Sequence, residues 1–239
     1  MSKSKKPSHQ NQLIIKDLSY TYANQATPVE VLKQINATFS PGVLYVIRGE
    51  SGSGKTTLLS LLSALDEVQE GDILYGSKSI RQIGYNNFRL NYVNIVFQSY
   101  NLIKYMTGVE NVQIAIDFSS EAKNEPAHTG PRIRAKTPEY FLEKVGLDPE
   151  TSSRLVGKLS GGQQQRVAIA RALASSVPII VADEPTGNLD EDTEKKVIDI
   201  FKDLAHEDGK IVILVTHSAQ VAHLADEVYR LSRGKLSKC

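Results

Sequence analysis

A glycine-rich segment in this 239-residue chain carries residue types that bind phosphate. It reads GESGSGKT from Gly49 to Thr56 and matches the pattern G-x-x-x-x-G-K-[ST]. Glycines let backbone amides turn toward phosphate oxygens, and the N-terminus of a following helix adds positive charge. We expect Lys55 to reach the terminal phosphates of a nucleotide and Thr56 to ligate Mg²⁺ through its hydroxyl. The positions expected to contact nucleotide are Gly49, Ser51, Gly52, Ser53, Gly54, Lys55, Thr56 and Thr57.

A ligand-free turn is the alternative interpretation of this glycine-rich segment. The flanking strand LYVIRG, the helical pattern that follows and the lysine itself argue against it. Charge alone assigns no role to the neighbours Arg48 and Glu50, so we treat both as scaffold or surface.

A second candidate is a pair of carboxylates at the end of an apolar run, PIIVADEP. A buried parallel strand would deliver Asp183 and Glu184 at its carboxyl end, beside the phosphate loop. Asp183 suits the shell of Mg²⁺, and Glu184 suits activation of water. By itself such a pair is usually a helix cap or a solvated turn, and the phosphate loop makes the catalytic interpretation stronger.

A third segment reads LSGGQ from Leu159 to Gln163. Ser160 and Gln163 form an S-x-x-Q capping box at a helix start, and the two glycines between them allow an anion to approach the amides. The pentapeptide is the signature of ATP-binding-cassette (ABC) ATPases, and the chain resembles this family from about Leu13 to Leu236. The resemblance implies nucleotide contacts from Ser160, Gly161, Gly162 and Gln163.

Four further residues match positions that the family uses at its ATP site. Tyr22 stands where an aromatic ring stacks on adenine, although Tyr20 is a near competitor. Gln98 matches a glutamine that contacts Mg²⁺ and links two subdomains. Asp190 matches a loop that contacts nucleotide, and it is also a suitable N-cap for the helix that follows. His217 matches a histidine near the γ-phosphate.

The resemblance implies hydrolysis of ATP to ADP and phosphate. Lys55 and Mg²⁺ would offset charge on the transferring phosphoryl group, while Glu184 polarises water and His217 orients or senses the γ-phosphate. In the family two cassettes meet head to tail, so the phosphate loop of one copy and LSGGQ of the other enclose each ATP. A second copy of this chain is therefore an expected partner.

Bulk composition restricts the environment and the other partners. The 28 basic and 27 acidic residues give a net charge of +1, so nucleic acid is not an expected partner. The single cysteine, Cys239, fits a reducing cytoplasm. No apolar stretch is long enough to cross a bilayer. With the resemblance, this predicts a location on the cytoplasmic face of the cell membrane, through a separate permease.

The elements that must position these residues follow an α/β pattern. Short β-branched runs alternate with helical patterns, as in parallel strands covered by helices, with half-exposed antiparallel strands before them and a closing hairpin after them. We expect a mixed sheet at each end of a parallel core. The predicted fold is a P-loop NTPase of ABC type with a mixed β-sheet core containing parallel strands, an antiparallel β subdomain and an inserted helical subdomain.

The chain divides into a disordered tail over residues 1–12 and one domain over 13–236, with the helical subdomain at about 99–159. A polar segment from Phe118 to Thr137 reads as a mobile surface loop. We expect the block after Gln98 to dock cytoplasmic helices of the permease. Its predicted lining is Tyr100, Leu102, Ile103 and Tyr105.

The predicted function is the ATP-hydrolysing motor of a transporter. Longer sequence segments such as ADEPTGNLD resemble one branch of the ABC family. That branch contains the lipoprotein-releasing, macrolide-efflux, cell-division and antimicrobial-peptide-resistance ATPases. An ABC ATPase of DNA repair would separate the site halves with a coiled coil or zinc module, and a translation factor would carry two cassettes. A catalytically dead module is disfavoured because the phosphate-loop lysine, both carboxylates and the histidine are present.

Overall fold

A computed structural model describes residues 11–23, 27–121, 136–187 and 189–239, without side chains for residues 119–121. Most of the predicted tail and of the predicted loop at 118–137 therefore lie outside the described residues. Gln12, which we placed in the tail, is buried, and its amide donates a hydrogen bond to the Ser40 hydroxyl at 2.9 Å. The packed body thus begins before the predicted boundary.

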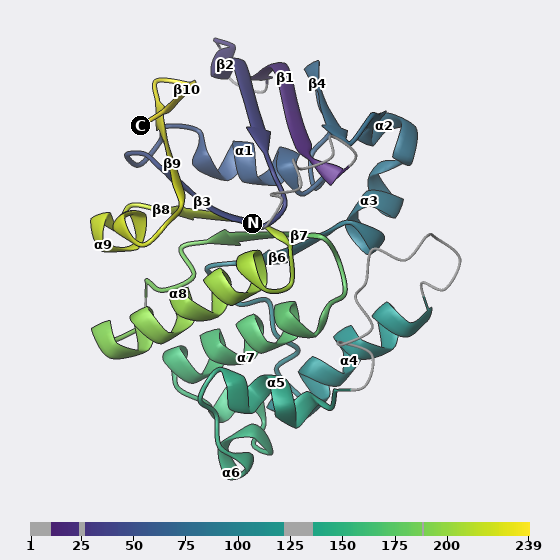
Figure 1. Ribbon diagram of the computed structural model, residues 1–239, viewed down its shortest axis with the longest axis vertical. Coiled ribbons are helices and arrows are strands. Elements are labelled where there is room, and N and C mark those ends of the chain that lie inside the picture. The colour runs from purple at the N-terminus through teal and green to yellow at the C-terminus, as the bar shows by residue number, and fades with distance from the viewer. Residues whose placement is uncertain (1–10, 24–26, 122–135, 188) are drawn as a thin grey trace, which may run out of the picture.

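The core of the molecule is a six-stranded sheet with the order β10-β9-β3-β8-β7-β6 (Figure 1). All neighbouring pairs are parallel except β9 and β10, which form the predicted closing hairpin. Because both faces are covered, the three central strands are apolar up to their last residues, which are Arg48, Asp183 and Thr216. The strands are β3 (Val43–Arg48), β6 (Val93–Val96), β7 (Ile179–Asp183), β8 (Ile211–Thr216), β9 (Glu227–Ser232) and β10 (Lys235–Lys238).

A second sheet is antiparallel and has the order β2-β1-β4-β5. Helix α1 (Lys55–Leu62) lies between the two sheets in Figure 1. Its leucines share one buried cluster with residues of both sheets. The strands are β1 (Leu13–Tyr22), β2 (Val29–Phe39), β4 (Glu70–Tyr75) and β5 (Lys78–Ser79).

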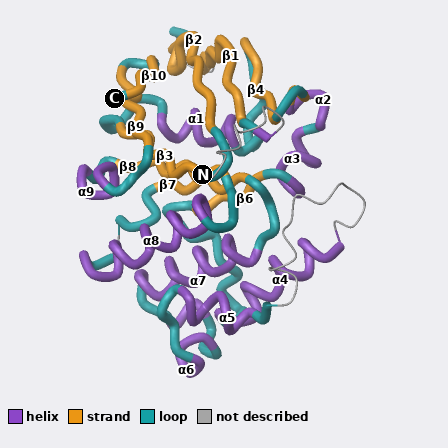
Figure 2. The backbone as a smooth tube through the Cα atoms, viewed as in Figure 1, coloured by secondary structure: helices purple, strands orange, loops and turns teal. Residues whose placement is uncertain are grey.

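Helices cover the other face of the parallel sheet (Figure 2). Alternate residues along the strands point to opposite faces, so Leu44 and Val46 pack on the helical side while Tyr45 and Ile47 pack toward α1. The helices after β6 are α4 (Gly108–Glu121), α5 (Pro138–Lys144), α6 (Pro149–Ser152), α7 (Gly161–Ala174), α8 (Glu191–His206) and α9 (Ala219–His223).

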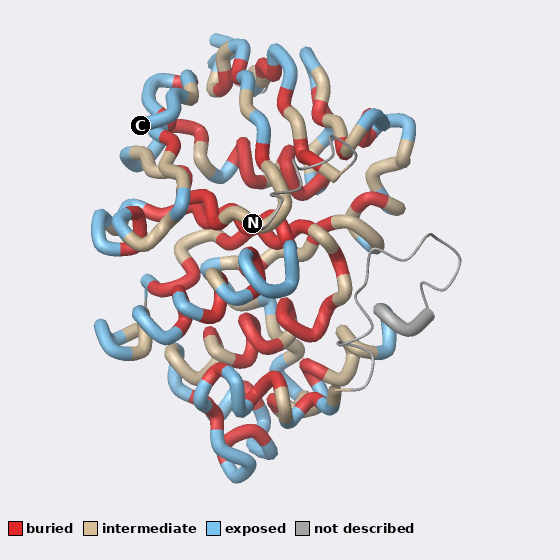
Figure 3. Tube along the Cα trace, viewed as in Figure 1, coloured by how far each residue is buried: buried red, intermediate tan, exposed pale blue. Residues whose placement is uncertain are grey.

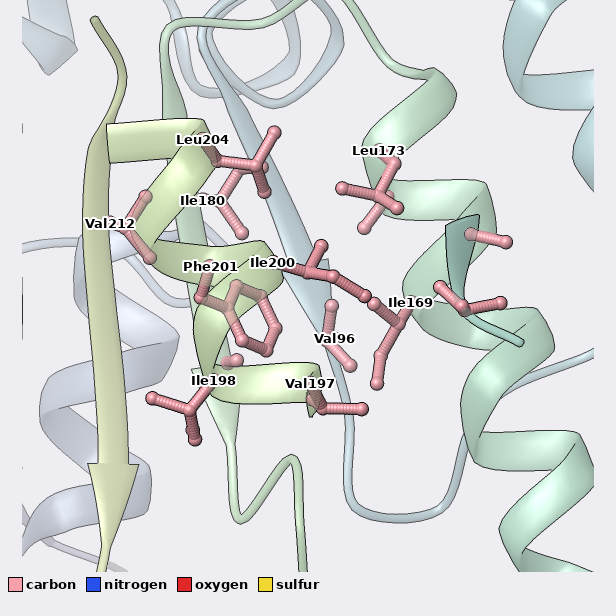
Figure 4. Packing of buried hydrophobic residues seen from close by; sticks show 14 of the residues in the cluster. Val96, Ile169, Leu173, Ile180, Val197, Ile198, Ile200, Phe201, Leu204 and Val212 are labelled. Carbon is pink, nitrogen blue, oxygen red and sulfur yellow. The ribbon is translucent and has the colours of Figure 1, made fainter. Parts of the chain in front are cut away.

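Figure 4 shows how α7 and α8 meet over the sheet. Ile169 and Leu173 of α7 face Ile200 of α8, and Ile180 of β7 belongs to the same cluster. In Figure 3 buried residues concentrate along the strands and on the inner sides of these two helices. The buried side of α7 thus runs from Gln165 to Ala174, and its first turn lies outside this core.

Two details of the predicted architecture need correction. The antiparallel strands β1, β2, β4 and β5 form a separate sheet rather than one end of the parallel core, and the β6 edge is parallel. A short unit between β5 and β6 was not predicted, and it consists of α2 (Ile80–Ile83) and α3 (Tyr85–Asn91).

Among the described residues, no helix has the length and apolar character needed to cross a membrane.

Candidate active site

The phosphate loop connects β3 to α1 and has the geometry of an anion cradle. Gly52 and Gly54 have φ values of 77° and 101°, a region that side-chain-bearing residues rarely adopt. A Cβ at Gly49 would lie 2.5 Å from Ser53 Oγ, so no larger residue fits there without a shift. Glycine at these positions therefore shapes the loop, as the sequence predicts.

The Lys55 ammonium group lies over the loop. Its Nζ donates hydrogen bonds to the carbonyl oxygens of Gly49 and Glu50, each at 2.8 Å. The Ser53 hydroxyl is buried, and among the residues that the structure describes it has no hydrogen-bond partner. A cation and a buried unpaired hydroxyl in a glycine cradle fit the phosphates of a nucleotide.

The carboxylate of Glu184 is held by three donors at the carboxyl edge of the sheet. The Thr216 hydroxyl donates to Oε2 at 2.8 Å, and the His217 backbone N–H donates to Oε1 at 3.0 Å. The His217 ring nitrogen Nδ1 lies 2.7 Å from the same Oε1. The Glu184 side chain is only 13% exposed, whereas that of His217 is 77% exposed. The base is thus fixed, and the histidine faces outward.

Thr216 is a contributor that the sequence analysis missed. It is the last residue of β8, directly before His217, so its position in IVILVTH was the available signal. Because β7 and β8 are parallel neighbours, their carboxyl ends bring Glu184 together with Thr216 and His217.

Asp183 ends β7 and is half-buried. Burial raises the pKa of its carboxyl, the negative charge of Glu184 raises it further, and the Lys55 ammonium lowers it. The influence of Lys55 places the carboxylate in the field of the phosphate loop. In the sheet β8 lies between β3 and β7, so Asp183 approaches the phosphate loop from the second strand over.

The described side chains alone do not form a complete metal site. Within the described ranges, no group of three or more His, Cys, Asp or Glu residues could hold a metal ion. Mg²⁺ commonly binds through one or two carboxylates together with phosphates and water. Asp183, with exposed Thr56 on α1, fits this partial donor set.

Tyr22 lies at the end of β1 against the start of α1. Its hydroxyl is 3.2 Å from Thr57 Oγ1, and its ring is among the exposed large side chains. Tyr20 meets it edge to face with ring centroids 5.1 Å apart, but packs against the buried cluster around α1. Of the two tyrosines, Tyr22 therefore offers the freer ring next to the phosphate loop.

The predicted LSGGQ segment starts α7 as a capping box. The Gln163 N–H donates to Ser160 Oγ at 3.3 Å, and the Ser160 N–H donates to Gln163 Oε1 at 2.9 Å. Ser160 and Gly161 are exposed. Within the part of the chain that the structure describes, no hydrogen bond joins residues 160–163 to the phosphate loop. The two predicted anion sites are not joined within one chain.

Gln98 and Asp190 are exposed. Gln98 follows the carboxyl end of β6 by two residues, and Asp190 follows the carboxyl end of β7. Asp190 is the N-cap of α8 and accepts from the Thr193 N–H at 3.0 Å and from its hydroxyl at 2.8 Å. These hydrogen bonds lower the pKa of Asp190. The capping role is present, and the nucleotide roles of both residues stay predictions.

Comparison with known proteins agrees with this geometry. The family model described as "ABC transporter" matches residues 32–187. The uncharacterized ABC transporter ATP-binding protein YclH of Bacillus subtilis is 46% identical over 94% of this chain and 95% of its own length. The macrolide export ATP-binding/permease protein MacB of Pasteurella multocida is 36% identical over 93% of this chain and 33% of its own length.

A solved structure has the same fold. It is the dimeric post-hydrolysis state of the ATP-binding cassette MJ0796 bound to ADP and Pi, with a TM-score of 0.83 and 34% sequence identity. The match covers 95% of this chain and 98% of that chain.

Proposed function

This chain belongs to the ABC transporter family and is an ATP-hydrolysing motor subunit, and from that premise we propose which residues do the work. Lys55 and the amides of the phosphate loop hold the β- and γ-phosphates of ATP. Thr56, Asp183 and Gln98 would hold Mg²⁺, which when bound would offset charge on these phosphates.

Glu184 acts as the general base in this proposal. Its two oxygens accept from Thr216 and His217, but a carboxylate has about four acceptor positions, so a water can still donate to it. That water loses its proton to the carboxylate as its oxygen attacks the γ-phosphorus, and the bond from the γ-phosphorus to the oxygen that bridges to the β-phosphate breaks, which releases ADP. The three donors on Glu184 are the observation that carries the proposal, because they fix the base before ATP arrives.

His217 completes the site on its exposed side. Because its ring is largely exposed and Nδ1–H donates to Glu184, its Nε2 can donate to a γ-phosphate oxygen when the ring carries both protons. The histidine can then report the presence of the γ-phosphate to the base. Tyr22 supplies a ring for adenine at the other end of the loop.

The second half of each site comes from another copy of the chain. Ser160 and the glycines after it form an exposed, preformed helix start, which suits the γ-phosphate of ATP bound to the opposite phosphate loop. The dimeric state of the similar MJ0796 structure supports this arrangement. Asp190 lies in the segment that such a dimer would bring to the partner's site.

The partner that receives the stroke is a membrane permease, which places the chain at the cytoplasmic face of the membrane. A groove of about 350 Å³ suits a permease helix. None of the four residues predicted to line a docking surface, Tyr100, Leu102, Ile103 and Tyr105, lines this groove, and Leu102 packs on the core. The apolar residues that line it are Leu90, Val93, Ile95, Phe97, Ile114, Ala115, Phe118 and Val177.

The Glu184→Gln variant tests the assignment. It keeps the shape of the base but removes its proton affinity, so turnover should fall by about 10² to 10⁴ while ATP binding persists. Unhydrolysed ATP should then hold two chains together, seen by size-exclusion chromatography with ATP and Mg²⁺. Glu207→Gln, an exposed site after α8, serves as the matched control. Near-normal turnover in Glu184→Gln would remove Glu184 from the base role.

A further inference from the structure

A buried amide connects the helix that begins with LSGGQ to the backbone of the proposed base. Gln165 lies five residues after Ser160 on α7 and is 1% exposed. Its Nε2 donates to the carbonyl oxygen of Pro185 and lies 3.4 Å from the carbonyl oxygen of Glu184. The side chain of one proposed half-site thus reaches the main chain of the other.

The backbone that Gln165 contacts is in an unusual conformation. Glu184 has a φ of 45°, which a residue other than glycine keeps only when its surroundings hold it. The Glu184 N–H still donates to Val215 of β8 at 2.8 Å, and the Gly187 N–H returns to the Glu184 carbonyl at 3.2 Å. Gln165 closes this turn from the helix side.

We propose that Gln165 is a positioning residue for catalysis, which sets the direction of the Glu184 carboxylate through the Glu184–Pro185 backbone. Gln165 is the first buried residue of α7, so a shift of the exposed first turn on binding a γ-phosphate is carried through it to this turn. Contact between Ser160 and ATP at one site therefore adjusts the base of the other site. This inference rests on the proposed function, in which Glu184 is the base and Ser160 serves the partner's ATP.

Simple packing explains Gln165 less well. Its Oε1 is buried and, in the described part of the chain, has no hydrogen-bond partner. A buried unpaired acceptor is unfavourable, so a methionine or leucine would fill the same space at lower cost. What the glutamine adds over an apolar side chain is the donor to the Glu184–Pro185 turn.

The Gln165→Met variant tests the proposal, because it keeps the length of the side chain and removes the donor. Misplacement of a catalytic group costs up to about 10²-fold, so kcat should fall between about tenfold and 10²-fold. The affinity of the monomer for ATP should stay within about twofold. As hydrolysis slows, the otherwise wild-type chain should accumulate as an ATP-bound dimer, an outcome that mere destabilisation would not produce.

Gln12→Met is the matched control. It also removes a buried amide with a side-chain hydrogen bond, but directly before β1 of the antiparallel sheet. It should change thermal stability without slowing turnover or accumulating the dimer. Gln165→Asn keeps the amide and shortens its reach, so it should reproduce the slow turnover even if the methionine variant does not fold.

The Glu184→Gln background separates the possible results. There Gln165→Met should cause no further loss of the residual rate, because the base is already absent. A kcat within twofold of wild type in both Gln165 variants would overturn the inference, as would a full additional loss in the Glu184→Gln background. If Glu184→Gln itself hydrolyses ATP normally, the proposed function fails instead.

Discussion

The two helices that begin at proposed phosphate sites start in opposite ways. Helix α1 has Gly54 as its N-cap in the left-handed conformation, with no side chain bonded to its first N–H groups. Helix α7 has Ser160 as its N-cap, and a capping box already satisfies part of its first turn. The first amides of α1 are thus available to phosphate oxygens, while at the start of α7 the side chain of Ser160 already accepts from one backbone N–H.

The difference extends to the surroundings of each helix. Helix α1 lies between two sheets, and Lys55 bonds to the phosphate loop of its own chain. The LSGGQ segment bonds to itself and faces solvent. In the proposed function, the phosphate loop therefore binds ATP by itself, whereas the LSGGQ segment contacts a nucleotide bound to another copy. Substitutions in the two regions should separate ATP binding from dimer formation.

The largest separate effect should come from Lys55→Ala. It removes a charge-assisted contact worth about 1.5 to 3 kcal/mol, so the monomer should bind ATP about 10- to 150-fold more weakly. Calorimetric titration of the monomer measures this directly. Lys78→Ala, at an exposed position of β5, is the control and should bind as the wild type does. Equal affinity in the Lys55 variant would mean that the loop binds without its lysine.

Most of the features compared above were predicted from sequence motifs. The phosphate loop, the carboxylate pair and the capping box are local patterns, so their geometry follows from short spacing along the chain. The fold class also followed, because alternating strand and helix patterns leave few topologies.

Contacts that depend on the tertiary fold were harder to predict from the sequence. Gln165 stands in a run of three glutamines and resembles helix surface, and its carbonyl partners come from another element. The position of β8 between β3 and β7 depends on sheet order, which local periodicity does not encode. The lining of the proposed docking groove was not predicted, because α3, β6, α4 and the end of α7 build it together.

A smaller effect is expected from Ser160→Ala on the other side of the comparison. Loss of an N-cap costs about 0.5 to 2 kcal/mol, so the ATP-held dimer of the Glu184→Gln chain should weaken by roughly tenfold. Affinity of the monomer for ATP should not change. Analytical ultracentrifugation with and without ATP measures the dimer.

The chain provides a close control for the Ser160 variant. Ser79 heads α2 with the same S-x-x-Q capping box, completed by Gln82, but lies away from both proposed half-sites. Ser79→Ala should lower thermal stability and leave the dimer intact. If Ser160→Ala instead weakens ATP binding by the monomer, the LSGGQ segment acts within its own chain and the head-to-tail arrangement is wrong.

The smallest effect on the nucleotide site should come from a substitution in the proposed docking groove, which lies in neither the phosphate loop nor the LSGGQ segment. Leu90 lines it and is 68% exposed, so Leu90→Glu removes little packing, and basal hydrolysis should stay within about twofold of wild type. A charged side chain among the apolar residues of the lining should weaken the docking of a permease helix there. The membrane permease that co-purifies with the wild-type chain from detergent-solubilised membranes should therefore be lost.

Leu65→Glu is the control for the Leu90 variant. Leu65 is 44% exposed and lies outside the groove, so the Leu65 variant should retain the permease. Retention by the Leu90 variant would move the docking surface elsewhere, and loss of basal activity would mean that Leu90 supports the fold.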